Sequence, residues 1–237
     1  MSVETTITRK IISVVEELRK KAHRGIPAVA LVISDNGLGK SASLESISGM
    51  PYLIYIKADP NLLTPYALIS EIARSGNIPR GHGFRATLGY ILARAKREKQ
   101  KTVLVIDEAK WVLRREKLAE LLRLLMEQTK WNMVFLGNPD LLEYIQRVRG
   151  LGVRVDQILR VDGADYKEED LIAIGRELGI KLRKDAIALL LSELREGTPM
   201  TQIVYALCEF GEGEEVGKEE IQEVLEIKNF VSGGSVS

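Results

Sequence analysis

Two short motifs carry residue types that can bind a polyphosphate and hydrolyse it. The first is the segment 34–41, Ser-Asp-Asn-Gly-Leu-Gly-Lys-Ser, which follows an apolar run and precedes a predicted helix. Its glycines allow backbone N–H groups to turn toward phosphate oxygens, Lys40 can reach the β- and γ-phosphates, and the Ser41 hydroxyl can bind Mg²⁺. The predicted nucleotide-binding residues are Ser34, Asp35, Asn36, Gly37, Leu38, Gly39, Lys40, Ser41 and Ala42. Because Ser34 replaces the first glycine of the usual pattern, the alternative is a glycine-rich turn with an incidental lysine.

The second motif is the pair Asp107-Glu108, which ends the apolar run 103–106. Asp107 would emerge at the carboxyl end of a buried strand, where ligands of open α/β sheets bind, and would hold Mg²⁺. Glu108 would polarise the water that attacks the γ-phosphate. An acidic pair at such a place can also cap the next helix, but its occurrence together with the first motif favours a site for ATP and Mg²⁺.

Polar residues beyond the next predicted strand extend this interpretation. Asn138 follows the apolar run 132–136 and would orient the water or contact the γ-phosphate, although Asn before Pro139 is also ordinary turn chemistry. A cluster of arginines then precedes the fifth predicted strand: Arg147, Arg149 and Arg154. An arginine presented to a neighbouring subunit can stabilise charge on the γ-phosphate, and a solvated basic loop is the alternative.

Alternating strands and helices would position these residues. Short apolar runs rich in β-branched residues predict strands at 28–33, 52–56, 102–106, 132–136 and 157–161. Helical patterns between them indicate a five-stranded parallel sheet with helices on both faces. From Tyr166 onward only helical patterns remain, at 168–178, 184–196, 200–210 and 218–227. The sequence therefore predicts an N-terminal helix (1–24), an α/β domain (25–163), a small all-α lid (164–230) and a flexible tail (231–237).

Composition argues against several other kinds of site. The 237 residues carry a net charge of +1, so any attraction to nucleic acid or membrane must be local. Cys208 is the only cysteine, which excludes an internal disulfide and a cysteine-based zinc site, and two histidines make a histidine-rich metal site improbable. No apolar segment reaches membrane-spanning length and residues 1–10 lack a signal-peptide core, so we expect a cytoplasmic protein without a membrane partner.

The order of these motifs resembles that of AAA+ ATPases with a P-loop. Within that superfamily the sequence is most similar to the DNA-transposition ATPases of the MuB/TnsC/TniB type and their ExeA-like relatives. The segment 135–145, Phe-Leu-Gly-Asn-Pro-Asp-Leu-Leu-Glu-Tyr-Ile, resembles their Gly-[Gln/Asn]-Pro-x-Leu segment, and 151–155 resembles their Leu-x-x-Arg-Ile/Val. This resemblance covers about residues 25–210 and implies that Arg154, or a nearby arginine (Arg147 or Arg149), acts across a subunit interface. The lid segment 197–202 departs from the pattern, because it has no arginine where many relatives carry Gly-x-x-Arg.

The resemblance also implies a DNA-binding surface. Eight Lys or Arg lie between Arg74 and Lys101 against one acid, and a second basic group follows Asp107-Glu108. In AAA+ rings these two regions tend to face the central channel, where they would make salt-sensitive, sequence-tolerant contacts with duplex phosphates. The predicted DNA contacts are Arg80, Arg85, Arg114 and Arg115. A solvated helix end is the alternative.

The sequence thus predicts a slow ATPase, stimulated by double-stranded DNA and by self-assembly into a ring or helical filament. By resemblance, it would select a target site and deliver it to a transposase. Two alternatives remain open at this point. One is a different AAA+ remodeller, such as a helicase loader or a secretion-type ATPase, and the other is a nucleotide-gated binding module with little hydrolysis.

Overall fold

A computed structural model describes residues 3–22, 27–98, 102–148 and 150–233 of the chain. Contacts divide the chain into two units. The sheet unit comprises residues 10–35 and 44–160, and the helical unit comprises residues 1–9, 36–43 and 161–237. The predicted phosphate loop therefore belongs to both, with Ser34 and Asp35 in the sheet unit and residues 36–41 in the helical unit.

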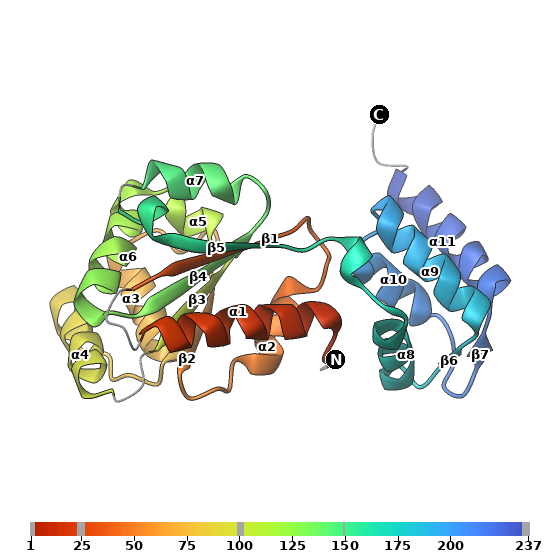
Figure 1. The fold of residues 1–237 in the computed structure, drawn as a ribbon, viewed down its shortest axis with the longest axis horizontal. Coiled ribbons are helices and arrows are strands. Elements are labelled where there is room, and N and C mark those ends of the chain that lie inside the picture. The colour runs from red at the N-terminus through yellow and green to blue at the C-terminus, as the bar shows by residue number, and fades with distance from the viewer. Residues whose placement is uncertain (1–2, 23–26, 99–101, 149, 234–237) are drawn as a thin grey trace. The chain divides into compact units, whose positions relative to one another are not determined.

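Five parallel strands form the core of the sheet unit in the order β2-β3-β4-β1-β5 (Figure 1). They are β1 (Val29–Ile33), β2 (Leu53–Lys57), β3 (Val103–Asp107), β4 (Asn132–Gly137) and β5 (Val155–Arg160). Strands β1, β3 and β4 are buried at every residue, as expected for apolar runs covered on both faces, whereas the edge strand β5 alternates between half-buried and exposed residues. All five predicted strands are confirmed, with ends shifted by one or two residues.

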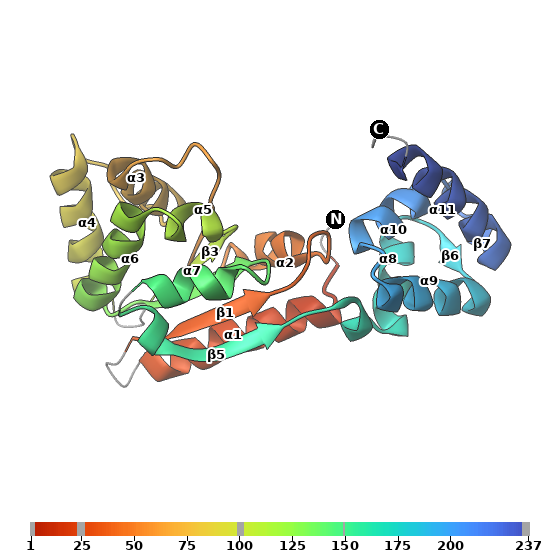
Figure 2. The ribbon, with the colours of Figure 1, turned by 90° about the horizontal axis from the view of Figure 1, so that it is seen from above.

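Helices cover this sheet because its alternate side chains point to opposite faces. One face, which includes Leu31, Ile106 and Phe135, packs on five helices. These are α3 (Pro65–Ser75), α4 (Phe84–Arg97), α5 (Lys110–Leu113), α6 (Glu116–Thr129) and α7 (Leu141–Arg147). Residues 10–22 of α1 (Thr6–Ala22) lie along β1 and β5 (Figures 1 and 2). Asn132, the first residue of β4, also contacts this helix, since its Nδ2 donates to Leu18 O. The four-residue α5 was not predicted, since it is too short to show a helical period.

The helical unit contains four helices of the C-terminal region together with the start of α2 (Lys40–Ile47). They are α8 (Glu168–Glu177), α9 (Lys184–Glu196), α10 (Met200–Leu207) and α11 (Lys218–Gly233), and α11 packs on α9 and α10 (Figure 2). Between them, β6 (Lys181–Leu182) and β7 (Glu215–Val216) form a parallel pair, which the prediction of an all-α lid did not include. A strand of two residues is too short to show the alternation of apolar and polar residues by which strands are predicted.

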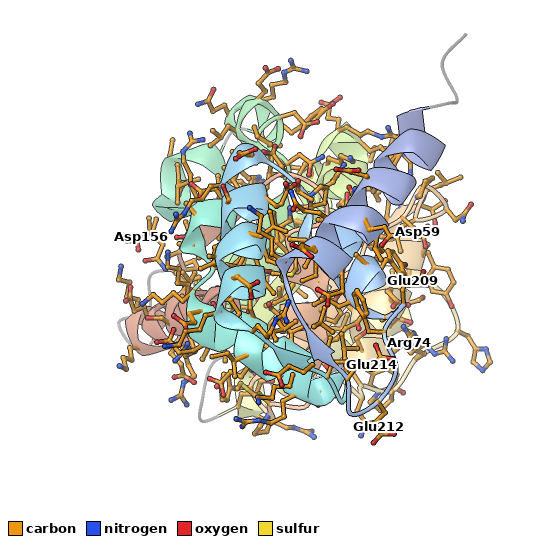
Figure 3. The ribbon with its side chains drawn as sticks, turned by 90° about the vertical axis from the view of Figure 1, so that its right-hand side faces the viewer. Asp59, Arg74, Asp156, Glu209, Glu212 and Glu214 are labelled. Atoms are coloured by element: carbon orange, nitrogen blue, oxygen red, sulfur yellow. The ribbon has the colours of Figure 1, made fainter. Side chains whose placement is uncertain are left out.

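The end of the chain also differs from the prediction. Helix α11 runs to Gly233 and so includes residues 231–233 of the expected flexible tail, and residues 234–237 lie outside the described part. Exposed carboxylates project from the segment between α10 and β7, among them Glu209, Glu212 and Glu214 (Figure 3). Among the described residues, no helix has both the length and the apolar character needed to cross a bilayer.

A buried carboxylate ties the N-terminal segment to α8 within the helical unit. Asp170 is only 2% exposed. Its Oδ1 accepts hydrogen bonds from the Thr6 N–H at 2.7 Å and the Thr6 hydroxyl at 3.1 Å, and its Oδ2 accepts one from the Lys167 N–H at 2.9 Å. Asp170 therefore caps α8 and binds the first turn of α1 at the same time.

Replacing Asp170 by Asn should lower the free energy of unfolding by about 1–3 kcal/mol. The NH₂ group of asparagine cannot accept a hydrogen bond, so either the Thr6 N–H or the Lys167 N–H would lose its acceptor. Urea unfolding followed by circular dichroism measures the change. Glu169→Gln removes an exposed carboxylate from the same helical turn and should cost less than about 1 kcal/mol, the contribution of helix-dipole charge alone. Equal losses in the two variants would contradict a role for the buried contacts.

Candidate nucleotide-binding site

The predicted phosphate loop begins at the carboxyl end of β1. The Ser34 N–H donates to Gly137 O at 3.2 Å, so the pairing of β1 with β4 continues one residue beyond the strand. Ser34 is buried, has a negative φ, and its hydroxyl donates to Asp35 O at 2.9 Å. Because the backbone at this position does not need the left-handed region, serine replaces the usual glycine without strain.

The central part of the loop, in the helical unit, does need glycine. Gly37 and Gly39 have φ values of 78° and 74°. A Cβ atom on Gly37 would also lie 2.7 Å from Pro199 Cβ, closer than real Cβ contacts allow. Lys40 begins α2 with its side chain buried, and the Ser43 N–H donates to Gly39 O at 3.0 Å. This backbone path is the one that a phosphate-binding loop requires before a helix N-terminus.

Two hydrogen bonds join this loop to the C-terminal helices of the same unit. The Thr201 N–H, in the first turn of α10, donates to Gly37 O at 3.1 Å, and the Tyr166 hydroxyl donates to Leu38 O at 3.1 Å. Burial, and secondarily the charge of Asp170, raises the pKa of Tyr166, so its hydroxyl stays protonated and able to donate. The sequence did not predict these contacts.

A small cavity of about 50 Å³ lies in the helical unit. Its lining includes Val3, Gly39, Ala42, Tyr166, Ile174 and Met200. Met200 is buried, and its thioether gives this cavity an apolar wall.

The second motif ends β3 in the sheet unit. Asp107 is fully buried, its Oδ1 accepts a hydrogen bond from the Glu108 N–H at 2.9 Å, and its Oδ2 accepts one from the Tyr55 hydroxyl at 3.2 Å. Glu108 has a φ of 50°, a left-handed conformation that costs about 1–3 kcal/mol in a non-glycine residue and that clusters at functional sites. Its Oε2 lies 3.6 Å from Lys110 Nζ. Tyr55 was missed because its approach to Asp107 depends on strand register.

Asn138 follows β4, the strand next to β3. Its Oδ1 is buried and has no hydrogen-bond partner among the described residues. A buried polar atom without a partner costs about 1–3 kcal/mol, so such an acceptor is typical of a position where water or ligand binds. Asp107 and Glu108 therefore lie at the end of β3, and Asn138 lies at the end of the neighbouring strand β4 within the same unit. Their carboxylate and amide oxygens are the kind of ligand that magnesium prefers.

The three candidate arginines differ in their surroundings. Arg154 is held within its own subunit, since Nη2 lies 3.1 Å from Glu127 Oε1 and Nη1 donates to Gly150 O at 3.0 Å. Arg147 has a side chain that is 70% exposed and pairs at 3.3 Å with Glu143 one turn earlier in α7. Arg149 lies outside the described residues. The assignment of Arg154 as the residue that acts across an interface stays a prediction.

The predicted DNA contacts also divide into two kinds. Arg80 and Arg85 are exposed and make no hydrogen bond or ion pair to another residue in the described ranges, and Arg114 is exposed with its guanidinium 3.9 Å from the centre of the Trp111 ring. Arg115 instead donates to Leu62 O at 2.8 Å and Pro60 O at 3.3 Å, so it stabilises the loop before α3. Arg80, Arg85 and Arg114 present cations to solvent, which Arg115 does only in part.

Comparisons with known proteins identify the family and the fold. A family model described as an AAA domain matches residues 25–145. The Orc1 protein of Aeropyrum pernix, solved in complex with DNA, has a similar fold, with a TM-score of 0.61 and 19% identity over 94% of this chain. The chain spans 64% of that protein's length. The RuvB Holliday junction branch migration motor of Thermotoga maritima has a TM-score of 0.55 and 15% identity, over 93% of this chain and 68% of its own.

A third similar structure is Drosophila ORC bound to DNA, with a TM-score of 0.54 and 18% identity, over 97% of this chain and 63% of the matched chain. At these identities the likeness concerns the fold. A search of curated proteins found no matching sequence.

Proposed function

This chain belongs to the AAA domain family, and we propose that it is an ATPase that assembles with copies of itself on duplex DNA when ATP and Mg²⁺ are bound. The observation that carries the proposal is the pairing of two features in one chain. A loop with positive φ at Gly37 and Gly39 precedes the buried Lys40, and β3 ends in a buried Asp107 followed by Glu108. The first feature suits phosphate oxygens and the second suits a hydrated magnesium ion.

Each residue has a separate task in this proposal. Backbone N–H groups of residues 36–41 and the Lys40 ammonium bind and orient the phosphates, while Ser41 and Asp107 hold the metal. When bound, Mg²⁺ supplies positive charge beside the phosphate oxygens. Glu108 takes a proton from the attacking water, and the unpaired Oδ1 of Asn138 accepts a hydrogen bond from that water.

Duplex DNA is proposed as the partner because exposed cations lie on two segments of the sheet unit. Arg80 lies in the loop before α4, Arg85 lies in the first turn of α4, which has no acidic residue, and Arg114 follows α5. Two proteins with this fold, Orc1 of Aeropyrum pernix and Drosophila ORC, were solved with DNA, which supports the choice. Guanidinium groups of this kind bind phosphates without reading bases.

Binding of a fluorescent duplex, followed by anisotropy, tests the proposal. With ATP we expect at least tenfold tighter binding than with ADP, and an affinity that falls steeply as salt rises from about 50 to about 200 mM. Lys40→Ala should remove the effect of ATP, because the phosphates lose their buried cation. Lys184→Ala, which changes an exposed lysine of α9, is the matched control and should behave like the unmodified protein. DNA binding that is indifferent to nucleotide would contradict the proposal.

We further propose that the protein is of the MuB/TnsC/TniB type and marks target DNA for a transposase. Support comes from the segments 135–145 and 151–155, which resemble those of that group. In a strand-transfer assay, target DNA preincubated with the protein and ATP should receive more insertions than bare DNA. Equal insertion into both targets, with ATP-dependent DNA binding intact, would favour another AAA+ remodeller such as a helicase loader.

A further inference from the structure

We propose that Tyr55 is a positioning residue that orients the Asp107 carboxylate for Mg²⁺, an inference that rests on the proposed function. The Tyr55 hydroxyl donates to Asp107 Oδ2 at 3.2 Å. On the other side, the Glu108 N–H donates to Oδ1 at 2.9 Å. One donor comes from a side chain of the neighbouring strand and the other from the backbone, so together they restrict rotation of the carboxylate.

Strand register explains why these two side chains meet. In the parallel pair β2–β3, Tyr55 lies opposite Val105 and Lys57 lies opposite Asp107. Tyr55 and Asp107 therefore point to the same face of the sheet as diagonal neighbours, a separation that a long aromatic side chain can bridge. A phenylalanine would fill the same half-buried space but would bring no donor.

The Tyr55 hydroxyl lies in a half-buried environment close to carboxylates. Burial raises its pKa most, and the Asp107 carboxylate raises it further through its charge and hydrogen bond. Glu45 and Glu108 add smaller contributions in the same direction. A carboxylate oxygen accepts hydrogen bonds, so the phenol O–H is the donor in this contact.

A fixed carboxylate is a better metal ligand than a rotating one. Partners that hydrogen-bond to metal ligands set the ligand's orientation, and their loss typically lowers metal affinity or activity by about 10–100-fold. Asp107 is fully buried, so water cannot replace the lost phenol freely. We therefore expect the hydroxyl of Tyr55 to act on Mg²⁺ binding while leaving the glycine loop unaffected.

The chain offers a matched control in the same region. Tyr52, just before β2, also donates its hydroxyl to a carboxylate, that of Glu16 in α1, and burial together with Glu16 raises its pKa to about 12. Glu16 is not part of the proposed site. Tyr52→Phe therefore removes a comparable phenol–carboxylate contact without touching Asp107.

The test compares Tyr55→Phe, Tyr52→Phe and the unmodified protein by titrating Mg²⁺ against binding of a fluorescent ATP analogue. Tyr55→Phe should raise the Mg²⁺ concentration needed for half-maximal tight binding by about tenfold. Affinity for the analogue in EDTA should stay near that of the unmodified protein. The thermal unfolding midpoint without nucleotide should fall by a few degrees at most, because the buried Asp107 carboxylate loses one hydrogen-bond donor. Mn²⁺ bound with ATP, observed by electron paramagnetic resonance, should show a similar loss of affinity. Tyr52→Phe should change neither metal measurement.

The outcomes separate this inference from the function it rests on. If the unmodified protein binds the analogue in a Mg²⁺-dependent way and Tyr55→Phe keeps the same dependence, the role of Tyr55 is overturned. Weaker binding of the analogue in EDTA would overturn it too, because the tyrosine would then support the fold of the site in general. If the unmodified protein fails to bind the analogue with Mg²⁺, the proposed function itself is wrong.

Discussion

Replacing Glu108 by Gln should lower the rate of ATP hydrolysis by at least about 100-fold, while ATP binding is retained. Glutamine has the shape of glutamate but cannot take a proton from water. The left-handed backbone of Glu108 places its side chain directly after β3, and glutamine at this position would keep that backbone and the length of the side chain. Steady-state phosphate release measures turnover, and binding of a fluorescent ATP analogue measures affinity.

The same variant should accumulate in the assembled state, because hydrolysis is the step proposed to release subunits from DNA. Size-exclusion chromatography with ATP and duplex DNA would show a larger species for Glu108→Gln than for the unmodified protein. Glu116→Gln, which changes an exposed glutamate at the start of α6, is the matched control and should hydrolyse ATP normally. A Glu108→Gln protein that hydrolyses at the normal rate as a monomer would refute the proposed site.

Replacing Arg154 by Ala should reduce turnover by about 10³–10⁵-fold if this guanidinium stabilises the γ-phosphate of a neighbouring subunit. Nucleotide binding by the single subunit should persist, since the affected site belongs to the next copy. Arg154 is held by Glu127 and by Gly150 O, so it must exchange these partners when subunits assemble. Glu127→Gln weakens one of these contacts but keeps the guanidinium, and it should preserve most of the turnover.

Mixing two inactive variants distinguishes an arginine that acts across the interface from one that only supports its own fold. Glu108→Gln subunits keep Arg154, and Arg154→Ala subunits keep Glu108, so mixed assemblies contain some complete sites. Partial recovery of turnover on mixing is the expected result. If Arg154→Ala remains active and Arg147→Ala, the more exposed candidate, is inactive, then the assignment made from sequence is wrong.

The sheet and most helices could be predicted because the burial of their side chains sets a recognisable pattern of apolar residues in the sequence. Runs such as 103–106 are apolar at every position since both faces of a central strand are buried, and α6 shows a clear helical period. The four-residue α5 and the β6–β7 pair could not be predicted, because a period needs more residues than they contain. The glycine loop and the acidic pair were recognisable for a different reason, since their chemistry demands particular residue types at fixed spacing.

The parts of the site that the sequence did not reveal depend on contacts between distant residues. Tyr55 meets Asp107 only through the register of β2 and β3. Arg115 was predicted to bind phosphate because it lies in a basic stretch of the sequence, but its guanidinium donates hydrogen bonds to the carbonyl oxygens of Pro60 and Leu62. The sequence shows how many cations a segment contains, but only the three-dimensional structure shows which of them are exposed to solvent.

The hydrogen bonds that join the loop to the lid have a consequence for how such proteins can change over evolution. The acceptors are the carbonyls of Gly37 and Leu38, and one donor is the backbone N–H of Thr201. Main-chain groups are present whatever side chain a position carries, proline apart. The backbone hydrogen bond from Thr201 to Gly37 O can therefore persist through most substitutions at these two positions. A connection made of main-chain groups tolerates changes of side chain that a connection between two side chains would not.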